Sequence, residues 1–243
     1  MGEKLKDQFG RTFPYIRLSI TDVCNFKCGY CLPNGYFKPN NHPGFLNISE
    51  IENLVNGLSD LGVSKIRVTG GEPTVRKDFF DVMKLIKAKE GIKKLVVTTN
   101  GYKLDKLAER FLETGVDGIN ISIDTLDRNK FKEITGHDRL PEILEGIKIL
   151  QSKGFNNIKV NAVLLKNIND TKEEFDRWEE FINNNKINFR YIELMQTGDN
   201  LDYFKKYHQS AKVFRDYIEL KGWKNIDRAR DDGPALNYIN ESI

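Results

Sequence analysis

The sequence predicts an α/β fold in which six strand–helix units form a parallel sheet. Short β-branched or apolar runs alternate with helical patterns from Tyr15 to about Glu193, which is typical of repeated strand–helix units. No Pro/Gly/Ser-rich linker or low-complexity segment interrupts this region. The strand runs also place apolar residues on one face and polar residues on the other. Together these observations predict a barrel-like sheet with helices on its outer face.

Six runs fit strands. In chain order they are Tyr15–Ile20, Lys65–Thr69, Lys94–Thr99, Gly118–Ile123, Asn157–Val163 and Asn188–Glu193. Ser49 begins a helix as a capping box with Glu52, and an apolar stripe follows it. A second stripe runs over residues 140–150, Thr171 with Glu174 caps a third helix, and another helix is expected near Lys212–Leu220.

One face of the predicted sheet is polar. In the run Gly118–Ile123 the isoleucines share one face, while Asn120 and Ser122 share the other with the following Asp124, because side chains alternate along a strand. The apolar face must meet the helices, so the polar face lines the inside of the barrel. The basic residues on this parity are Arg17, Lys65, Arg67, Lys159 and Arg190. Buried cations without partners are unfavourable, so this lumen requires an anion. The alternative is that these side chains lie at strand ends and extend into solvent.

Length and composition set broad limits. A chain of 243 residues with 39% hydrophobic and 30% charged residues is typical of a globular protein, either one large α/β domain or two small ones. No apolar run approaches the roughly 20 residues that span a bilayer, and the start MGEKLKDQFGRTF lacks a signal-peptide core. The net charge of +3 favours neither nucleic acid nor a membrane surface as a partner. We therefore expect a cytoplasmic protein with no nucleic-acid or membrane partner.

All three cysteines lie in one loop, SITDVCNFKCGYCLPNG, directly after the first predicted strand. Three thiols cannot form a closed disulfide set, and their C-x3-C-x2-C spacing indicates metal or redox chemistry. A [4Fe–4S] cluster normally takes four thiolates, so Cys24, Cys28 and Cys31 would leave one iron open to a small molecule. The alternative is a structural zinc site with His42 or another group as the fourth ligand. None of the three histidines lies at the short spacing that zinc motifs usually show.

The cysteine motif, with the aromatic Tyr30 before its last cysteine, resembles that of the radical S-adenosylmethionine (SAM) enzymes. Further blocks are similar, in the same order, to the GTP 3′,8-cyclases of molybdenum cofactor biosynthesis: KIRVTGGEPTVRKD, VVTTNG, NISIDTLDRNKFKEITGHD, KVNAVLLKNINDTKEE and FRYIELMQTG. The resemblance implies a partial (β/α)6 TIM-like barrel of the radical SAM type over residues 1–198, followed by a helical and irregular segment over residues 199–243. It also implies one [4Fe–4S] cluster on the three cysteines, and SAM as a second cofactor.

The resemblance assigns residues to each ligand. The residues expected at SAM are Gly70, Gly71 and Glu72 at the methionyl amino group, the Tyr30 backbone and Met195 at the adenine, and Ser122. The residues expected at GTP are Arg17, Arg67, Thr98 and Lys159, with Lys65 and Arg190 on neighbouring basic positions. Several converging cations suit a triphosphate, because arginine can bind phosphate through two parallel hydrogen bonds.

The resemblance further implies GTP as the substrate, an external electron donor and, as one option, a homodimer. The family carries a second cluster on three cysteines near its C-terminus. This chain has no further cysteine, so we expect it to be truncated relative to the family. His137 stands where an arginine is expected. Two alternatives stay open, namely a radical SAM enzyme that acts on another substrate such as a peptide, and an inactive barrel that only binds ligand.

Overall fold

The six predicted strands form one parallel sheet. The computed structural model describes residues 4–197, 200–227 and 235–240. The strands are β1 (Tyr15–Ser19), β2 (Lys65–Thr69), β3 (Lys94–Thr99), β4 (Gly118–Ser122), β5 (Ile158–Leu164) and β6 (Asn188–Glu193). They lie in the sheet in the order in which they occur in the chain. The prediction is confirmed, with ends that differ by at most one residue.

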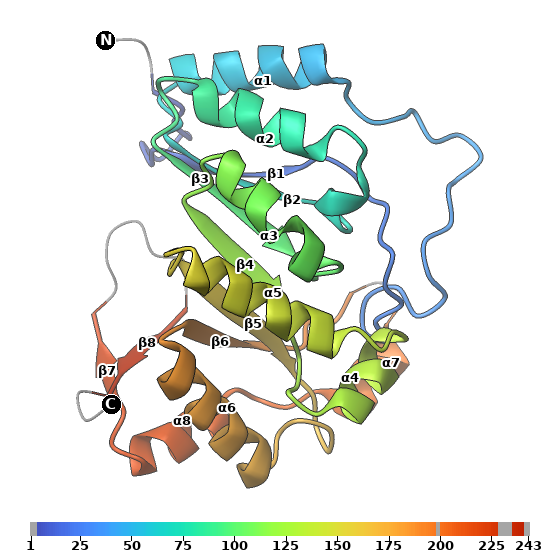
Figure 1. Cartoon of the computed structure of the whole chain (residues 1–243), viewed down its shortest axis with the longest axis vertical. Coiled ribbons are helices and arrows are strands. Elements are labelled where there is room, and N and C mark those ends of the chain that lie inside the picture. Colours follow the sequence, from blue (N-terminus) through green and yellow to red (C-terminus); the bar gives the residue numbers. More distant parts are fainter. Residues whose placement is uncertain (1–3, 198–199, 228–234, 241–243) are drawn as a thin grey trace.

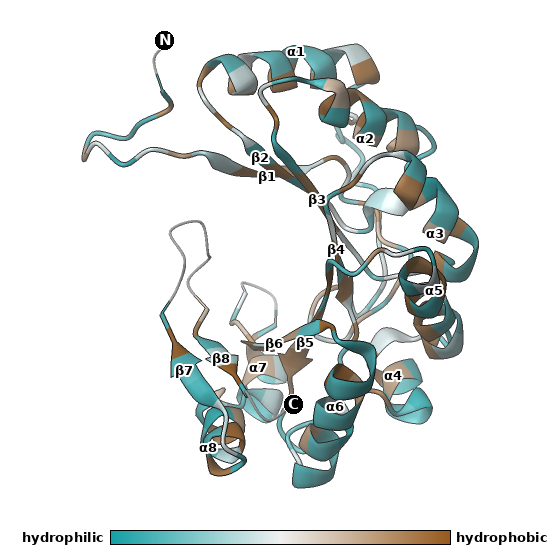
Figure 2. Ribbon diagram, turned by 60° about the vertical axis from the view of Figure 1, so that its left-hand side comes forward, coloured by the Kyte–Doolittle hydropathy of each residue, from teal (hydrophilic) through white to brown (hydrophobic). Residues whose placement is uncertain are grey.

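The sheet is curved and open. β1 and β6 are its two edges and do not pair with each other, so the barrel is partial, as predicted. Figure 2 shows the sheet bending from β1 to β6, with α1, α2, α3, α5 and α6 along its convex side. The short hairpin of β7 (Lys224–Ile226) and β8 (Asn237–Ile239) lies beyond β6 and was not predicted.

Helices connect the strands. They are α1 (Ile48–Asp60), α2 (Phe79–Ala88), α3 (Leu104–Glu113), α4 (Arg128–Thr135), α5 (Leu140–Ser152), α6 (Lys172–Asn185), α7 (Leu201–Tyr207) and α8 (Lys212–Leu220), with a 3-10 turn at Pro73–Val75. Figure 1 shows α1, α2, α3 and α5 packed side by side along the sheet. The helix predicted near Lys212–Leu220 is confirmed as α8.

The predicted N-terminus of α1 was wrong by two residues. The helix begins at Ile48, and its capping box pairs Asn47 with Glu50 rather than Ser49 with Glu52. The Asn47 Oδ1 atom accepts from the Glu50 amide at 3.0 Å, and the Glu50 carboxylate accepts from the Asn47 amide at 2.7 Å. Both pairs have the right spacing, but the asparagine pair satisfies the first free amides of this helix.

Thr171 is the N-cap of α6, as predicted, but Glu174 does not complete a capping box. The buried Glu174 carboxylate accepts instead from the Thr125 hydroxyl at 2.9 Å and from the Lys130 ammonium at 2.7 Å. A fully buried carboxylate requires such partners. It therefore ties α6 to the segment that joins β4 to α4.

The two faces of the sheet differ as the alternation of apolar and polar residues predicted. In β5 the side chains of Ile158, Val160 and Ala162 are fully buried toward the helices, whereas Lys159 and Asn161 are only half-buried on the concave face. The strand register continues this face across the sheet, for example from Ser122 to Asn161. The hydrophobic core therefore lies between the sheet and its helices.

The C-terminal part of the described chain contains α7, α8 and the β7–β8 hairpin. The expected boundary between residues 198 and 199 lies outside the described residues. None of the described helices is both long enough and apolar enough to cross a bilayer.

Candidate functional site

The cysteine loop follows β1 and lies against the C-terminal end of α4. The Lys27 amide donates to the Thr135 carbonyl at 3.0 Å, and the Gly29 amide donates to the Ile134 carbonyl at 3.1 Å. Cys24 and Cys28 are half-buried, Cys31 is exposed, and all three thiols are free. Burial raises the pKa of each thiol, and a thiol must lose its proton before it can bind a metal ion. The structure thus presents three thiols from one loop at the C-terminal rim of the sheet.

A structural zinc site would need the three thiols and a fourth ligand grouped around one ion. Within the described ranges, no three His, Cys, Asp or Glu side chains are grouped so that they could hold a metal ion. His42 is also engaged, because its Nε2 lies 3.0 Å from the Asp22 carboxylate and its Nδ1 accepts from the Gly44 amide at 2.9 Å. Three thiolates leave one iron of a [4Fe–4S] cluster without a protein ligand, whereas a structural zinc site requires a fourth protein ligand. The donor set therefore fits an iron–sulfur cluster better than the zinc alternative.

Gly70 and Gly71 join the end of β2 to the cysteine loop. The Gly71 amide donates to the Thr21 carbonyl, and the Glu72 amide donates to the Val23 carbonyl, both at 2.8 Å. A Cβ at Gly70 would lie 2.5 Å from the Thr21 carbonyl oxygen, and one at Gly71 would lie 2.5 Å from the carbonyl oxygens of Asp22 and Val23. Only glycine permits this approach. The turn that is expected at SAM is therefore joined directly to the residues before Cys24.

Glu72, which the resemblance places at the methionyl amino group, does not present an open carboxylate at the rim. Its side chain is fully buried. The carboxylate accepts four hydrogen bonds, from the Thr74 amide at 3.0 Å, the Thr74 hydroxyl at 2.6 Å, the Thr99 hydroxyl at 2.8 Å and the Asn100 amide at 2.5 Å. Burial raises the pKa of Glu72, although these hydrogen bonds lower it. A carboxylate has about four acceptor positions, so those of Glu72 are all occupied. Because its partners lie in the turn after β2 and at the end of β3, Glu72 fixes these two segments to each other.

Asn100, which the sequence analysis did not single out, connects the end of β3 to the cysteine loop. Its side-chain amide donates to Asn25 Oδ1 at 2.8 Å and lies 3.9 Å from the Cys24 sulfur. Asn-Gly at positions 100–101 is a turn signal in the sequence. That signal indicates a turn but not the contact with the cysteine loop.

Two segments expected at the adenine of SAM meet at one amide. Asn200 Nδ2 donates to the Tyr30 carbonyl at 3.3 Å and to the Met195 carbonyl at 3.2 Å. The Met195 side chain itself is 72% exposed. The structure therefore brings Tyr30 and Met195 together through their backbone, while the half-buried Ser122 lies beside Asn161 on the concave face.

The basic residues gather on the concave face. Burial lowers the pKa of Arg67, and the positive charges of Arg17 and Arg190 lower it further. Arg67 Nε is buried without a hydrogen-bond partner, and the guanidinium lies 5.3 Å from the centre of the Tyr15 ring. In the described part of the chain, neither Arg17, Arg67 nor Arg190 forms a salt bridge. Three arginines without a carboxylate partner are suited to bind an anion.

The other residues expected at GTP extend this face. The Lys65 ammonium lies 5.2 Å from the centre of the Tyr15 ring. Tyr15 and Lys65 are paired in register between β1 and β2, so both lie on the same face of the sheet. The Thr98 hydroxyl accepts from Asn120 Nδ2 at 3.3 Å, and Asn120 is paired in register with Lys159. The set expected at GTP therefore shares one face of the sheet.

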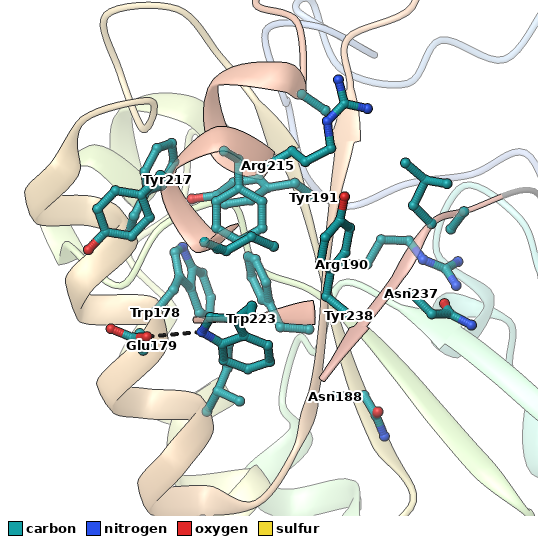
Figure 3. Close-up of a pocket in the computed structure, with 18 of the residues that line it drawn as sticks. Trp178, Glu179, Asn188, Arg190, Tyr191, Arg215, Tyr217, Trp223, Asn237 and Tyr238 are labelled. Atoms are coloured by element: carbon teal, nitrogen blue, oxygen red, sulfur yellow. Dashed lines mark hydrogen bonds between the residues drawn. The ribbon is translucent and has the colours of Figure 1, made fainter. Parts of the chain in front are cut away.

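A cavity of about 760 Å³ lies between β6, α6, α8 and the β7–β8 hairpin. Lys159 and Arg190 line it, whereas Arg17, Lys65 and Arg67 do not. Figure 3 shows its aromatic wall, where Trp223 donates to Glu179 at 3.0 Å. The further polar lining residues include Arg215, Asn237 and Tyr238. This cavity could not be predicted from the sequence, because its lining comes from segments far apart in the chain.

Comparisons with known proteins show the family of this chain. Residues 18–182 match the Radical SAM superfamily. A GTP 3′,8-cyclase of Mannheimia succiniciproducens is 45% identical over 232 residues, which cover 96% of this chain and 68% of that protein. A GTP 3′,8-cyclase of Photorhabdus laumondii is 46% identical over 236 residues, which cover 97% of this chain and 71% of that protein.

Solved structures share the fold at lower identity. Streptococcus suis SuiB bound to S-adenosylmethionine has a TM-score of 0.69 at 22% identity, and the match covers 86% of this chain and 46% of that one. A radical SAM methyltransferase from Sphaerobacter thermophilus has a TM-score of 0.66 at 14% identity, with 88% and 68% covered. The family match and the identities of 45% and 46% show that the chain belongs to the radical SAM superfamily and, within it, to the family of the GTP 3′,8-cyclases.

Proposed function

We propose that this chain is a GTP 3′,8-cyclase of molybdenum cofactor biosynthesis, which converts GTP to (8S)-3′,8-cyclo-7,8-dihydroguanosine 5′-triphosphate. The observation that carries the proposal is the joining of three free thiols to the Gly70–Gly71 turn, at one rim of the sheet whose concave face carries the three arginines. The identity of about 45% to two cyclases across nearly the whole chain supports it.

Cys24, Cys28 and Cys31 would hold one [4Fe–4S] cluster and leave one iron without a protein ligand. When bound and reduced by an external donor, this cluster supplies the cleavage of SAM to a 5′-deoxyadenosyl radical. Two of these thiols, Cys24 and Cys28, are half-buried, and the side-chain amide of Asn100 lies beside the Cys24 sulfur. Free thiols and such a cluster require a reducing compartment, which supports a cytoplasmic location.

SAM would lie across the rim between the cysteine loop and β4. The Tyr30 and Met195 carbonyls now share the amide of Asn200, so two acceptors already converge where one amino group donates. That arrangement suits the amino group of an adenine, which would take the place of the Asn200 amide. Because the Glu72 carboxylate is saturated, the backbone of Gly70 and Gly71 would hold the methionyl amino group. Ser122 would contact the same ligand from β4.

GTP would bind deeper on the concave face. Arg17, Arg67 and Arg190 would hold the triphosphate, and its negative charge would offset the mutual repulsion that lowers the pKa of Arg67. Lys65, Thr98 and Lys159 lie on the same face. The overall conversion joins C3′ of the ribose to C8 of the guanine, and the curved sheet would shield this reaction from water.

An anaerobic assay tests the proposal. The reconstituted chain is supplied with SAM, dithionite and GTP, and the nucleotide products are identified by mass spectrometry and by comparison with an authentic standard. The proposal expects a cyclised guanosine triphosphate that does not form when SAM is omitted. Release of 5′-deoxyadenosine without any change in GTP would contradict the cyclase function and favour another substrate.

A further inference from the structure

The ring of Tyr15 contacts two of the cations expected at GTP. The Lys65 ammonium lies 5.2 Å from the ring centre, and the Arg67 guanidinium lies 5.3 Å from it. A cation within about 6 Å of an aromatic ring centre is attracted to the face of that ring. Tyr15 is the first residue of β1 and is paired in register with Lys65, and Arg67 follows on the same face because side chains alternate along a strand. The proposed function as stated above gives Tyr15 no role.

The Tyr15 hydroxyl contributes no hydrogen bond to this arrangement. Its oxygen is buried and has no partner among the residues that the structure describes, and the same holds for Arg67 Nε. A buried hydroxyl without a partner is unfavourable, so it does not explain why the side chain lies here. What Tyr15 offers to the cations is therefore the face of its ring.

An aromatic ring holds a cation without neutralising it. A carboxylate at this position would also attract Arg67, but it would compete with phosphate oxygens for the hydrogen bonds of the guanidinium. In the part of the chain that the structure describes, Arg67 forms no salt bridge. Long side chains that are held in place before a ligand arrives also lose less rotamer freedom when it binds. The ring therefore orders the cation and leaves it able to bind an anion.

We propose that Tyr15 is a positioning residue of the triphosphate site, which acts through Arg67 and Lys65. Its ring fixes the two cations on the concave face before the substrate binds, and the Arg67 guanidinium then pairs with phosphate oxygens. This inference rests on the proposed function, because it requires that a triphosphate binds at these cations.

The experiment is isothermal titration calorimetry of the reconstituted full chain with GTP and with inorganic tripolyphosphate. The proteins are the wild type, Tyr15→Leu, Tyr15→Phe and Phe9→Leu, each with its melting temperature measured. Phe9→Leu is the matched control, because Arg11 lies 5.6 Å from the centre of the Phe9 ring and that side chain is 73% exposed. We expect Tyr15→Leu to weaken the binding of both ligands by about three- to tenfold. Tyr15→Phe keeps the ring and should bind both as the wild type does.

Two results would overturn the inference. One is equal affinity of the wild type and Tyr15→Leu for both ligands. The other is a Tyr15→Phe protein that binds as weakly as Tyr15→Leu, which would assign the role to the hydroxyl.

A double variant separates positioning from a general effect on structure. Because Tyr15 acts partly through Arg67, Tyr15→Leu should cost less affinity for tripolyphosphate in the Arg67→Ala background than in the wild type. An equal loss in both backgrounds would contradict this route.

If Tyr15→Leu does not fold, a ring-fluorinated phenylalanine in place of Tyr15 provides the test. Fluorine withdraws electron density from the face of the ring, so it weakens the attraction for cations while the ring remains. This protein should bind both ligands more weakly than Tyr15→Phe, and equal affinities would overturn the inference. A wild-type chain that binds neither ligand would instead contradict the proposed triphosphate site, so the two failures are distinguishable.

Discussion

Arg190 on β6 acts electrostatically on Arg67 on β2, and its positive charge helps to lower the pKa of the Arg67 guanidinium. Three strands separate β2 from β6 in the sheet. The influence of the Arg190 charge, which adds to that of burial, therefore depends on the curvature of the sheet, which brings the concave faces of distant strands toward each other (Figure 2). An anion that binds between them would relieve this repulsion.

Arg67→Ala should weaken GTP binding by about tenfold or more, because a charge-assisted hydrogen bond contributes roughly 1.5–3 kcal/mol. Isothermal titration calorimetry of GTP with the wild type and with Arg67→Ala measures this loss of affinity. Arg128→Ala is the matched control, since Arg128 is exposed and paired with Asp138. ATP should bind much like GTP at these cations, because they contact phosphate rather than base, and added salt should weaken both. Equal GTP affinity in the wild type and in Arg67→Ala would show that the basic face is not the phosphate site.

Gly71→Ala should disrupt the cysteine loop. The added Cβ would lie 2.5 Å from two backbone carbonyl oxygens of that loop, and such overpacking destabilises by about 1–3 kcal/mol. Thermal denaturation should show a lower melting temperature, and reconstitution should show less iron per chain. Gly57→Ala in α1 is the control, because nothing lies within 4 Å of its Cβ position. That variant should be as stable as the wild type or slightly more stable.

Glu72→Gln should lower the free energy of unfolding by about 1–3 kcal/mol, because its amide nitrogen must face at least one of the donors that now reach the carboxylate. Chemical denaturation measures this loss. Glu50→Gln should cost less, since Glu50 is exposed and its amide oxygen can still accept from Asn47. A Glu72→Gln protein that unfolds like the wild type but no longer binds SAM would restore the expectation that this carboxylate contacts the ligand.

Cys28→Ala should abolish cluster binding, whereas His42→Ala should not. The wild type is expected to take up about four iron and four sulfide per chain. Both ring nitrogens of His42 are already engaged, with Asp22 and Gly44. Metal analysis after anaerobic reconstitution distinguishes a three-cysteine iron–sulfur cluster from a zinc site that includes His42. Stoichiometric zinc that is lost in His42→Ala would establish the structural zinc site instead.

The sheet could be predicted from the sequence because most of its strands alternate apolar and polar residues, while β3 is a short apolar run. Helix α7 was missed, since none of its side chains is buried and no apolar stripe marks it. Strands β7 and β8 have three residues each and are largely exposed, which is too little for a pattern.

The thiols, the glycines and the parity of the basic residues could likewise be read from the sequence. The burial of Glu72 could not, because it depends on Thr99 and Asn100, which lie on another strand and its following turn. The amide of Asn200 reaches Tyr30 across 170 positions of the chain. Local patterns predict which side chains are present at a site, whereas such contacts depend on the assembled fold.

Cleavage of SAM without GTP is the most direct test of the three-cysteine cluster beside the Gly70–Gly71 turn. The reconstituted chain is incubated with SAM and dithionite under anaerobic conditions, and 5′-deoxyadenosine is quantified by liquid chromatography. Cleavage needs only the open iron and the SAM-binding turn, so the wild type should release 5′-deoxyadenosine and Cys28→Ala should release none. A wild-type chain that carries the full cluster and yet forms no 5′-deoxyadenosine would contradict the proposed site.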